Sequence, residues 1–204
     1  MFTPVRPPYL LRRYYNRFTW NIPGEGRKVY LTFDDGPVTG VTDFVLDTLD
    51  DFKVKATFFC IGANVKKNPE LFQRTLQSGH RVGNHTFQHT NGWLTNVDVY
   101  VKDVAEAAHC ITSNLFRPPY GRIKKSQAEL LLQQYRIIMW DVLSYDFDSG
   151  IKPAQCLQNV TMHTRPGSVI VFHDSQKAFS NVKAILPRYL EFLLKNDFVP
   201  EVIP

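Results

Sequence analysis

The feature that most constrains the fold of this chain is a regular alternation of short apolar runs with segments of helical character. One helix is clearly marked, because Asn68 stands at its N-cap position, Pro69 follows in the first turn and Gly79 ends it. Strands separated by helices favour parallel βα units. Further helices are predicted over about 96–114, 126–134, part of 153–164 and 181–195. The predicted strands are 29–33, 56–61, 81–84, 115–117, 137–140, 168–173 and 198–203.

These elements predict an α/β fold with about seven parallel strands, which either closes as a barrel or stays open and doubly wound. The 204 residues fit one domain. We place this domain at residues 28–204, because residues 1–27 have a different composition, rich in arginine, proline and aromatic residues. Such a mixture occurs in membrane-binding and nucleic-acid-binding segments. No helical or stacking period appears, so we expect the segment to pack across one end of the domain with its aromatic rings buried.

Bulk properties exclude few classes of protein. The net charge of +5 is mildly basic and only weakly favours anionic ligands, and we expect no nucleic-acid partner. Cys60, Cys110 and Cys156 lie far apart and are predicted to be free thiols in the core. No run approaches the roughly 18 apolar residues of a membrane span. Arginines interrupt the N-terminal residues, so no signal peptide is predicted. We expect a cytoplasmic protein, with the cell envelope as the alternative, and the oligomeric state stays open.

Polar residues recur at the points where the predicted strands end. In a parallel sheet the functional groups collect at the carboxyl ends of the strands. We therefore expect these side chains to face one common opening. They are Asp34 and Asp35 after the first strand, His85 after the third, Arg117 at the fourth, Trp140 and Asp141 at the fifth, and His173 and Asp174 at the sixth.

The sequence HTFQH, residues 85–89, predicts a pair of metal ligands. Histidines four residues apart fall on one face of a helical turn, and neutral imidazoles are common ligands of zinc. Asp34 or Asp35 is a natural third ligand, and the other carboxylate would then be free to act as a base on water. Such a site leaves coordination positions open, as catalytic sites do. The alternative is that both histidines are ordinary side chains and that DDGP is only a polar turn.

Two further motifs could complete a catalytic site. In RPPYG, residues 117–121, the prolines stiffen a loop that could present a backbone N–H group to a developing oxyanion. Arg117 could pair with the free aspartate. His173 ends an apolar strand, where it could donate a proton, and either Asp146 or Asp174 could orient its ring.

TFDDGP, HTFQH, RPPYG and the strand ending in His173 follow one another in the chain, and together they resemble the polysaccharide deacetylases of carbohydrate esterase family 4, the NodB-homology domain. The resemblance covers roughly residues 28–203. It implies a distorted (β/α) barrel, often with seven strands, and one divalent metal, usually Zn²⁺, with Co²⁺ or Ni²⁺ as alternatives. It also implies hydrolysis of the C–N bond of a linear amide, which releases acetate from N-acetylglucosamine-type sugars.

The same resemblance implies individual roles. In the family pattern Asp34 is the general base, oriented by Arg117, whereas Asp35 binds the metal together with His85 and His89.

The resemblance also implies which residues donate a proton and hold the oxyanion. His173 is expected to protonate the leaving amine, Asp146 to tune His173, and the backbone N–H of Tyr120 to hold the oxyanion. Phe147 stands where the family usually has tryptophan, and Val171 where it usually has leucine. Both changes affect the pocket for the acetyl methyl group. We expect this pocket to be lined by Trp140, Phe147 and Val171.

Three other functions compete with an active N-deacetylase. One is a catalytically silent relative that binds glycan at the same opening, and a second is an esterase that removes O-acetyl groups from xylan. The third is a basic N-terminal module for membrane or nucleic acid. An acetate-release assay with added zinc or cobalt separates the silent relative from an active enzyme, and a screen of acetylated oligosaccharides identifies the substrate. Salt-dependent binding after deletion of residues 1–20 tests the third function.

Overall fold

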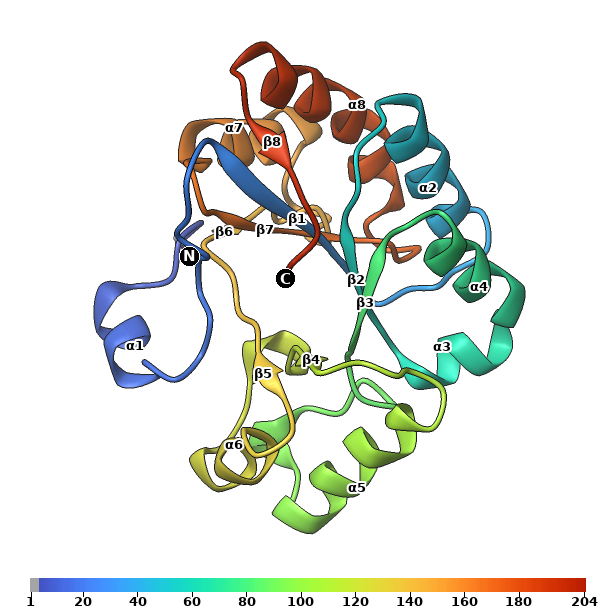
Figure 1. Cartoon of the computed structure of the whole chain (residues 1–204), viewed down its shortest axis with the longest axis vertical. Coiled ribbons are helices and arrows are strands. Elements are labelled where there is room, and N and C mark those ends of the chain that lie inside the picture. Colours follow the sequence, from blue (N-terminus) through green and yellow to red (C-terminus); the bar gives the residue numbers. More distant parts are fainter. Residues whose placement is uncertain (1–3) are drawn as a thin grey trace.

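The structure is a computed structural model that describes residues 4–204, and its centre is one parallel sheet. The strand order is β5-β4-β3-β2-β1-β7-β6, and the sheet curls into a half-barrel with the helices outside it (Figure 1). The predicted distorted (β/α) barrel with about seven parallel strands is confirmed. The strands are β1 (Lys28–Asp34), β2 (Thr57–Cys60), β3 (Arg81–Asn84), β4 (Leu115–Phe116), β5 (Arg136–Ile137), β6 (Val142–Leu143), β7 (Val169–His173) and β8 (Val199–Pro200), which pairs with the start of β1.

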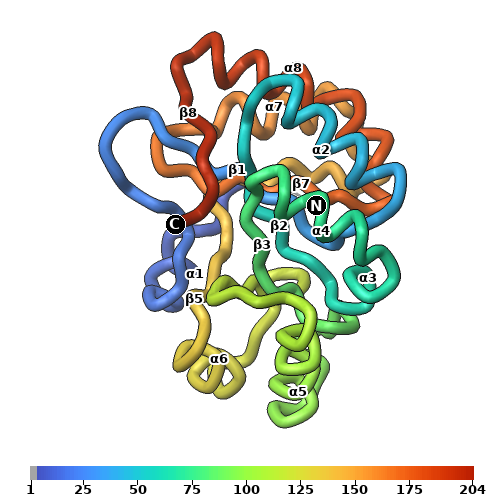
Figure 2. Tube along the Cα trace, turned by 45° about the vertical axis from the view of Figure 1, so that its right-hand side comes forward, coloured from blue at the N-terminus to red at the C-terminus, as the bar shows by residue number. Residues whose placement is uncertain are grey.

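Helices cover the outer face of the sheet, with α3 and α4 between two larger groups (Figure 1). Helices α5 and α6 lie together at one end of the molecule, and α2, α7 and α8 lie together at the other (Figure 2). The helices are α1 (Tyr9–Tyr14), α2 (Val41–Asp51), α3 (Gly62–Lys67), α4 (Pro69–Gln77), α5 (Val97–Ala108), α6 (Lys125–Leu131), α7 (Pro153–His163) and α8 (Phe179–Lys195), with the 3₁₀ turns η1 (Gly92–Leu94) and η2 (Pro119–Gly121). None of the helices within residues 4–204 is long and apolar enough to cross a membrane.

Strand β1 is the centre of the core, because it is buried on both faces. Its side chains alternate, so that Leu31 and Phe33 pack into the outer core. Tyr30 joins an apolar cluster on the other face of the sheet. The ring of Phe33 stacks on those of Phe58 and Phe172, with centroids 5.1 and 5.8 Å apart. A strand covered on both faces reads as a nearly continuous apolar run, which is why the sequence predicted it.

Strand register brings residues that are far apart in the sequence together at the carboxyl edge of the sheet. Asp34, the last residue of β1, pairs with Phe59 of β2 on one side and with His173 of β7 on the other. Asp34 and His173 are therefore neighbours across adjacent parallel strands, although many residues separate them in the sequence.

The N-terminal segment runs along the edges of β5 and β6, between which the barrel has no direct strand pairing. The Thr19 N–H donates to the carbonyl of Ile137 at 2.9 Å, and the Met139 N–H donates to that of Thr19 at 2.7 Å. The Leu143 N–H donates to the carbonyl of Val5 at 3.0 Å. The segment therefore adds backbone hydrogen bonds to two strand edges. Residues 1–3 of the predicted segment 1–27 lie outside the described residues.

The expectation that this segment buries its aromatic rings is only half right. Phe18 and Trp20 are buried, and Trp20 donates its indole N–H to the carbonyl of Tyr15. Tyr9 and Tyr14, at the two ends of the short helix α1, remain 76% and 69% exposed. The helix α1 buries none of its residues, and the ring of Tyr14 meets only the edge of the neighbouring Tyr15 ring, with centroids 4.8 Å apart.

Asp141 is an exception to the expected gathering of polar residues at one opening. Its backbone N–H donates to the carbonyl of Val169 at the start of β7, which places it near the opposite end of the sheet. Its fully buried carboxylate is paired with Arg6, Arg12 and Arg165 at 2.7, 3.3 and 3.1 Å. Asp141 directly precedes β6 and does not line the pocket, and its carboxylate instead holds the N-terminal segment through Arg6 and Arg12.

Several predicted elements differ from the observed ones. The fifth strand ends at Ile137 and not at residue 140, and β6 follows as a separate strand, too short to show a period. Helices α1, α2 and α3 were not predicted. Asn68 does stand before α4, but its side chain accepts no bond from that helix. Its amide instead donates to the carbonyls of Asn64 and Pro37, because α3 runs directly into α4.

The three cysteines are free thiols, as predicted. Cys60 and Cys156 are buried, whereas Cys110 is only partly buried and does not belong fully to the core. Burial raises the pKa of the Cys60 thiol well above its ordinary value, so this thiol stays protonated and unreactive.

Candidate active site

Asp34 and Arg117 form a buried ion pair inside the barrel. The Arg117 guanidinium donates to Asp34 Oδ1 at 2.6 Å and to the hydroxyl of Thr32 at 2.7 Å. It also donates to the carbonyls of Ile138 and Met139 and lies 4.1 Å above the ring of Phe59. Burial lowers the pKa of Arg117, and the charge of Asp34 opposes this effect. The arrangement fixes one carboxylate in a single position beside the pocket.

Asp35 is held in the left-handed backbone region, with φ of 84°. This conformation is costly for a residue other than glycine and is common at functional sites. The turn is supported by Asp174, whose carboxylate accepts hydrogen bonds from the Gly36 N–H at 3.0 Å and the Thr42 hydroxyl at 2.6 Å. A Cβ at Gly36 would lie 1.9 Å from Asp174 Oδ2, so only glycine fits there. The two adjacent aspartates therefore point their carboxylates to different partners.

His85 and His89 bring their Nε2 atoms to the carboxylate of Asp35, at 3.7 and 3.2 Å from its Oδ1. One potential ligand atom from each of the three residues lies within 4.8 Å of the others. The predicted helical turn is wrong, because residues 85–89 are a loop in which Thr86 and His89 have φ of 64° and 57°. Two left-handed residues turn the loop back on itself, and this brings the imidazoles together.

The chemistry of these three groups fits a divalent metal. The Nδ1 of His85 lies 2.8 Å from the carbonyl of Arg117, which fixes the ring and leaves Nε2 free to bind. Burial lowers the pKa of His85 to about 4, so the ring is neutral at pH 7. Burial alone would raise the pKa of Asp35, but the hydrogen bond from His89 and the charge of His173 lower it well below its ordinary value. Neutral imidazoles and an ionised carboxylate are the donor set of catalytic zinc sites.

His173 is oriented by Asp146 and not by Asp174. The two oxygens of Asp146 lie 2.8 Å from the ring Nδ1 of His173 and 2.7 Å from its backbone N–H, which both donate to the carboxylate. Burial acts to lower the pKa of His173, but the charge of Asp146 and the hydrogen bond to it prevail and raise this pKa to about 9. The imidazolium form therefore predominates at pH 7, and its Nε2 carries a proton.

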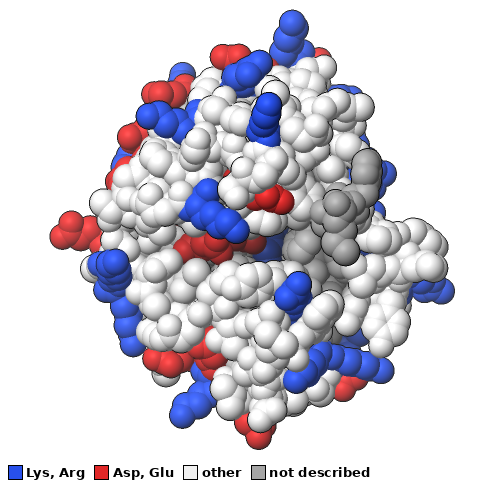
Figure 3. All heavy atoms as spheres, turned by 180° about the vertical axis from the view of Figure 1, so that it is seen from behind, with Lys and Arg blue, Asp and Glu red and all other residues white. Residues whose placement is uncertain are grey.

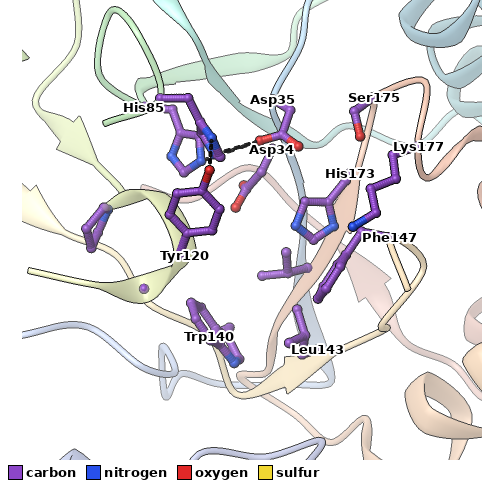
Figure 4. Close-up of a pocket in the computed structure, with 14 residues that line it drawn as sticks. Asp34, Asp35, His85, Tyr120, Trp140, Leu143, Phe147, His173, Ser175 and Lys177 are labelled. Carbon is purple, nitrogen blue, oxygen red and sulfur yellow. Dashed lines mark hydrogen bonds and ion pairs between the residues drawn. The ribbon is translucent and has the colours of Figure 1, made fainter. Parts of the chain in front are cut away.

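These groups surround one pocket of about 400 Å³. The apolar side chains of Trp140, Leu143 and Phe147 line one side of it, across from His85 and Asp35 (Figure 4). Seen from behind, the molecule has a hollow near its centre with carboxylate-bearing residues at the floor and basic residues beside it (Figure 3). The predicted site residues that line the pocket are Asp34, Asp35, His85, His89, Tyr120, Trp140, Phe147, Val171 and His173, whereas Arg117 and Asp146 lie behind them.

The sequence of this chain also matches that of known proteins. The sequence profile of the polysaccharide deacetylase family matches residues 21–136. This chain belongs to that family. A peptidoglycan-N-acetylglucosamine deacetylase of Bacillus cereus is 34% identical over 165 residues, which cover 78% of this chain and 60% of the relative. A chitooligosaccharide deacetylase of Rhizobium leguminosarum bv. trifolii is 29% identical and is covered to 73% of its length, with 74% of this chain aligned.

Solved structures agree with the family assignment. The crystal structure of the Bc1960 peptidoglycan N-acetylglucosamine deacetylase superposes with a TM-score of 0.80 at 30% identity, covering 95% of this chain and 94% of that one. The half-barrel is thus the fold of this deacetylase family. The chain spans only 60% of the length of the first Bacillus cereus relative and 33% of a Listeria monocytogenes deacetylase.

Phe147 and Val171, the two positions expected to depart from the usual family pattern, both lie in the pocket. Phe147 meets the ring of His173 edge-on, with centroids 4.8 Å apart and planes at 72°. Val171 is buried in a small cluster with Leu143 and Tyr145. Both side chains are apolar and line the same pocket as His173.

Some pocket residues were missed by the sequence analysis. Leu143 was missed because β6 was not predicted, and no period marks so short a strand. Ser175 and Lys177 also line the pocket, from the loop that follows β7. The only sequence evidence for them was that Ser175 and Lys177 follow His173 by two and four residues. The Nζ of Lys177 lies 5.7 Å from the ring centroid of Phe147.

Proposed function

We propose that this chain is a metal-dependent hydrolase that removes N-acetyl groups from an acetylated glycan. The observation that carries the proposal is the meeting of three groups at one pocket: the Asp35, His85 and His89 cluster, the Arg117-bound Asp34 and the Asp146-bound His173. The named activities of the relatives, on peptidoglycan N-acetylglucosamine and chitooligosaccharide, support a substrate of this class.

Asp35, His85 and His89 would hold the metal, for which the two imidazoles and one carboxylate favour Zn²⁺. The bound cation supplies Lewis-acid chemistry toward water and the acyl carbonyl. The site has the features that tune a catalytic metal, because a backbone carbonyl orients His85 from behind.

Asp34 accepts the proton of the attacking water in this proposal. Arg117 holds its carboxylate at 2.6 Å, so the second oxygen stays available. As the hydroxyl oxygen bonds to the acyl carbon, negative charge develops on the carbonyl oxygen. The backbone N–H of Tyr120 would then donate to that oxygen, from a residue whose φ of 60° turns the loop toward the pocket.

His173 gives its proton to the leaving amine nitrogen. Asp146 keeps the ring protonated and fixes its Nδ1, so that Nε2 is the atom that releases the proton. The C–N bond then breaks, acetate leaves, and the sugar retains a free amine. Phe147 and Val171 exclude water beside this ring and shape the space for the acetyl methyl group.

The experiment is an acetate-release assay on N-acetylglucosamine oligomers and on acetylated xylan, with and without a chelator. The proposal expects release from the N-acetylated oligomers that a chelator abolishes and Zn²⁺ restores. Release from xylan alone would identify an O-acetyl esterase, and binding without release would identify a silent glycan-binding relative. Asp34→Asn should keep its metal and lose turnover by roughly 100-fold or more. Substantial turnover in this variant would refute Asp34 as the base.

A further inference from the structure

Trp93, on the 3₁₀ turn η1, is held in a fixed position with much of its ring in solvent. Trp93 is 56% exposed, yet its indole N–H donates to the carbonyl of Ile123 at 3.3 Å and its backbone N–H to the Asn91 side chain at 3.1 Å. The preceding Gly92 packs tightly, since a Cβ there would lie 2.5 Å from the carbonyl oxygen of Arg122. These contacts fix the ring without covering it, so packing alone does not account for its exposed face.

One guanidinium connects this tryptophan with the pocket. The Arg122 guanidinium carbon lies 5.3 Å from the ring centroid of Trp93 and 5.9 Å from that of Tyr120. Tyr120 lines the pocket, and its hydroxyl lies 3.1 Å from Nδ1 of His89. The residues therefore form a row that leads from the metal cluster through Tyr120 and Arg122 to Trp93. Both loops of this row follow neighbouring strands, β3 and β4, at the carboxyl edge of the sheet.

The row has the chemistry of a binding surface for a pyranose ring. The axial C–H face of a pyranose is apolar and packs on the negative face of an aromatic ring, while its equatorial hydroxyls project outward as hydrogen-bond partners. Trp93 offers the flat ring, and Arg122 offers several N–H donors beside it. A large ring held in a fixed orientation loses little conformational entropy on binding, which is typical of recognition residues.

We propose that Trp93 and Arg122 form a second sugar subsite, which binds the unit next to the one that is deacetylated. This inference rests on the proposed function and specifies its substrate: an extended chain of at least two linked pyranoses rather than a free monosaccharide. Trp93 stacks on the apolar face of the neighbouring unit, and Arg122 donates to its hydroxyl or carboxylate oxygens. Tyr120 separates this subsite from the metal cluster.

The experiment compares variants of the full chain, loaded with Zn²⁺, on a tetramer of N-acetylglucosamine and on 4-nitrophenyl acetate. Trp93→Leu should raise KM for the tetramer about tenfold, equivalent to about 1.4 kcal/mol, with kcat unchanged. Trp93→Phe keeps an aromatic face and should retain most of the affinity. Leu94→Ala is the matched control, because Leu94 is on the same turn and 84% exposed. The small ester does not reach the subsite, so its kcat/KM should be equal in all variants.

A binding measurement separates this inference from the proposed function. Calorimetry of the tetramer with the wild type and with Trp93→Leu should show about tenfold weaker binding by the variant. If no form releases acetate but the variant binds more weakly, the subsite stands and the proposed hydrolysis fails. If the two proteins bind the tetramer equally, or if KM is unchanged, the subsite is refuted whatever the turnover. A loss of ester hydrolysis in Trp93→Leu would also count against it, by indicating damage to the pocket.

Discussion

Replacing Asp146 by asparagine tests whether the charge of Asp146 keeps His173 protonated. Asparagine keeps the size of the side chain but removes the negative charge that lies 2.8 Å from Nδ1 of His173. Burial lowers the pKa of His173, and in the variant the charge of Asp146 would no longer oppose this effect. The pKa of His173 should therefore fall from about 9 to its ordinary value near 6.5 or below. A change of that size corresponds to about 3 kcal/mol.

The consequence for turnover can be calculated at pH 8. With a pKa of about 9, roughly nine-tenths of the His173 rings are protonated, whereas with a pKa near 6.5 only about one-thirtieth are. The acid-requiring step of Asp146→Asn should therefore slow about 30-fold at pH 8, and the alkaline limb of its kcat/KM profile should move toward lower pH. The assay is acetate release from pH 5 to 10, with nuclear magnetic resonance titration of His173 in the metal-free protein.

The same shift predicts the pH dependence of stability. Because the folded-state pKa of His173 is raised, its contribution to the free energy of unfolding is fully present below about pH 6.5 and is lost as the pH rises through about 9. In Asp146→Asn this loss should disappear. Asp148→Asn is the matched control, since the carboxylate of Asp148 accepts a hydrogen bond from Gly150 instead. If the alkaline limb of the kcat/KM profile is the same in Asp146→Asn as in the wild type, the role of Asp146 in raising the pKa of His173 is refuted, and with it the role of His173 as the acid.

Two further substitutions test the metal cluster and the turn that carries it. His85→Ala removes one of three ligands and should weaken Zn²⁺ binding by about 100-fold or more, measured by elemental analysis after dialysis. His163 lies outside the cluster, so His163→Ala should bind Zn²⁺ as the wild type does. Equal metal content in both variants would contradict the ligand assignment. Gly36→Ala forces a Cβ against the Asp174 carboxylate and should cost about 3 kcal/mol, lowering Tm by roughly 6–12 °C in calorimetry. Gly24→Ala, which has no atom near its Cβ, should melt as the wild type, and an equal Tm for both would show that the turn tolerates the side chain.

The nature and order of the main elements could be predicted from the sequence. The strands β1, β2, β3 and β7 are almost entirely buried. A strand buried on both faces has a short, nearly continuous apolar sequence, and such a sequence can be recognised without the structure. Elements without such a sequence pattern were not predicted, among them the two-residue strand β6 and the short helix α3. Local patterns report the burial of a segment, so a segment too short to show a period leaves no signal.

The candidate site divides in the same way. The residue types of the metal cluster, the aspartate pair and His173 were evident from motifs that stand at strand ends. The helical turn expected for His85 and His89 was wrong, although the two imidazoles do meet, because the loop reaches the same result through left-handed residues. The motif thus predicted which side chains are close, but not the backbone that brings them together.

Only the tertiary structure decided which partner each group has. Asp146 and Asp174 were equal candidates for orienting His173, and strand pairing together with the following loop gave that position to Asp146 and placed Asp174 beneath Gly36. Asp141 seemed to belong to the pocket, yet it lies near the opposite end beneath three arginines. The sequence alone determined the main buried strands, the family motifs and the chemical groups at the strand ends. Pairing order and register between distant segments decided their contacts, because hydrogen bonds and charges act over a few ångströms that no local pattern specifies.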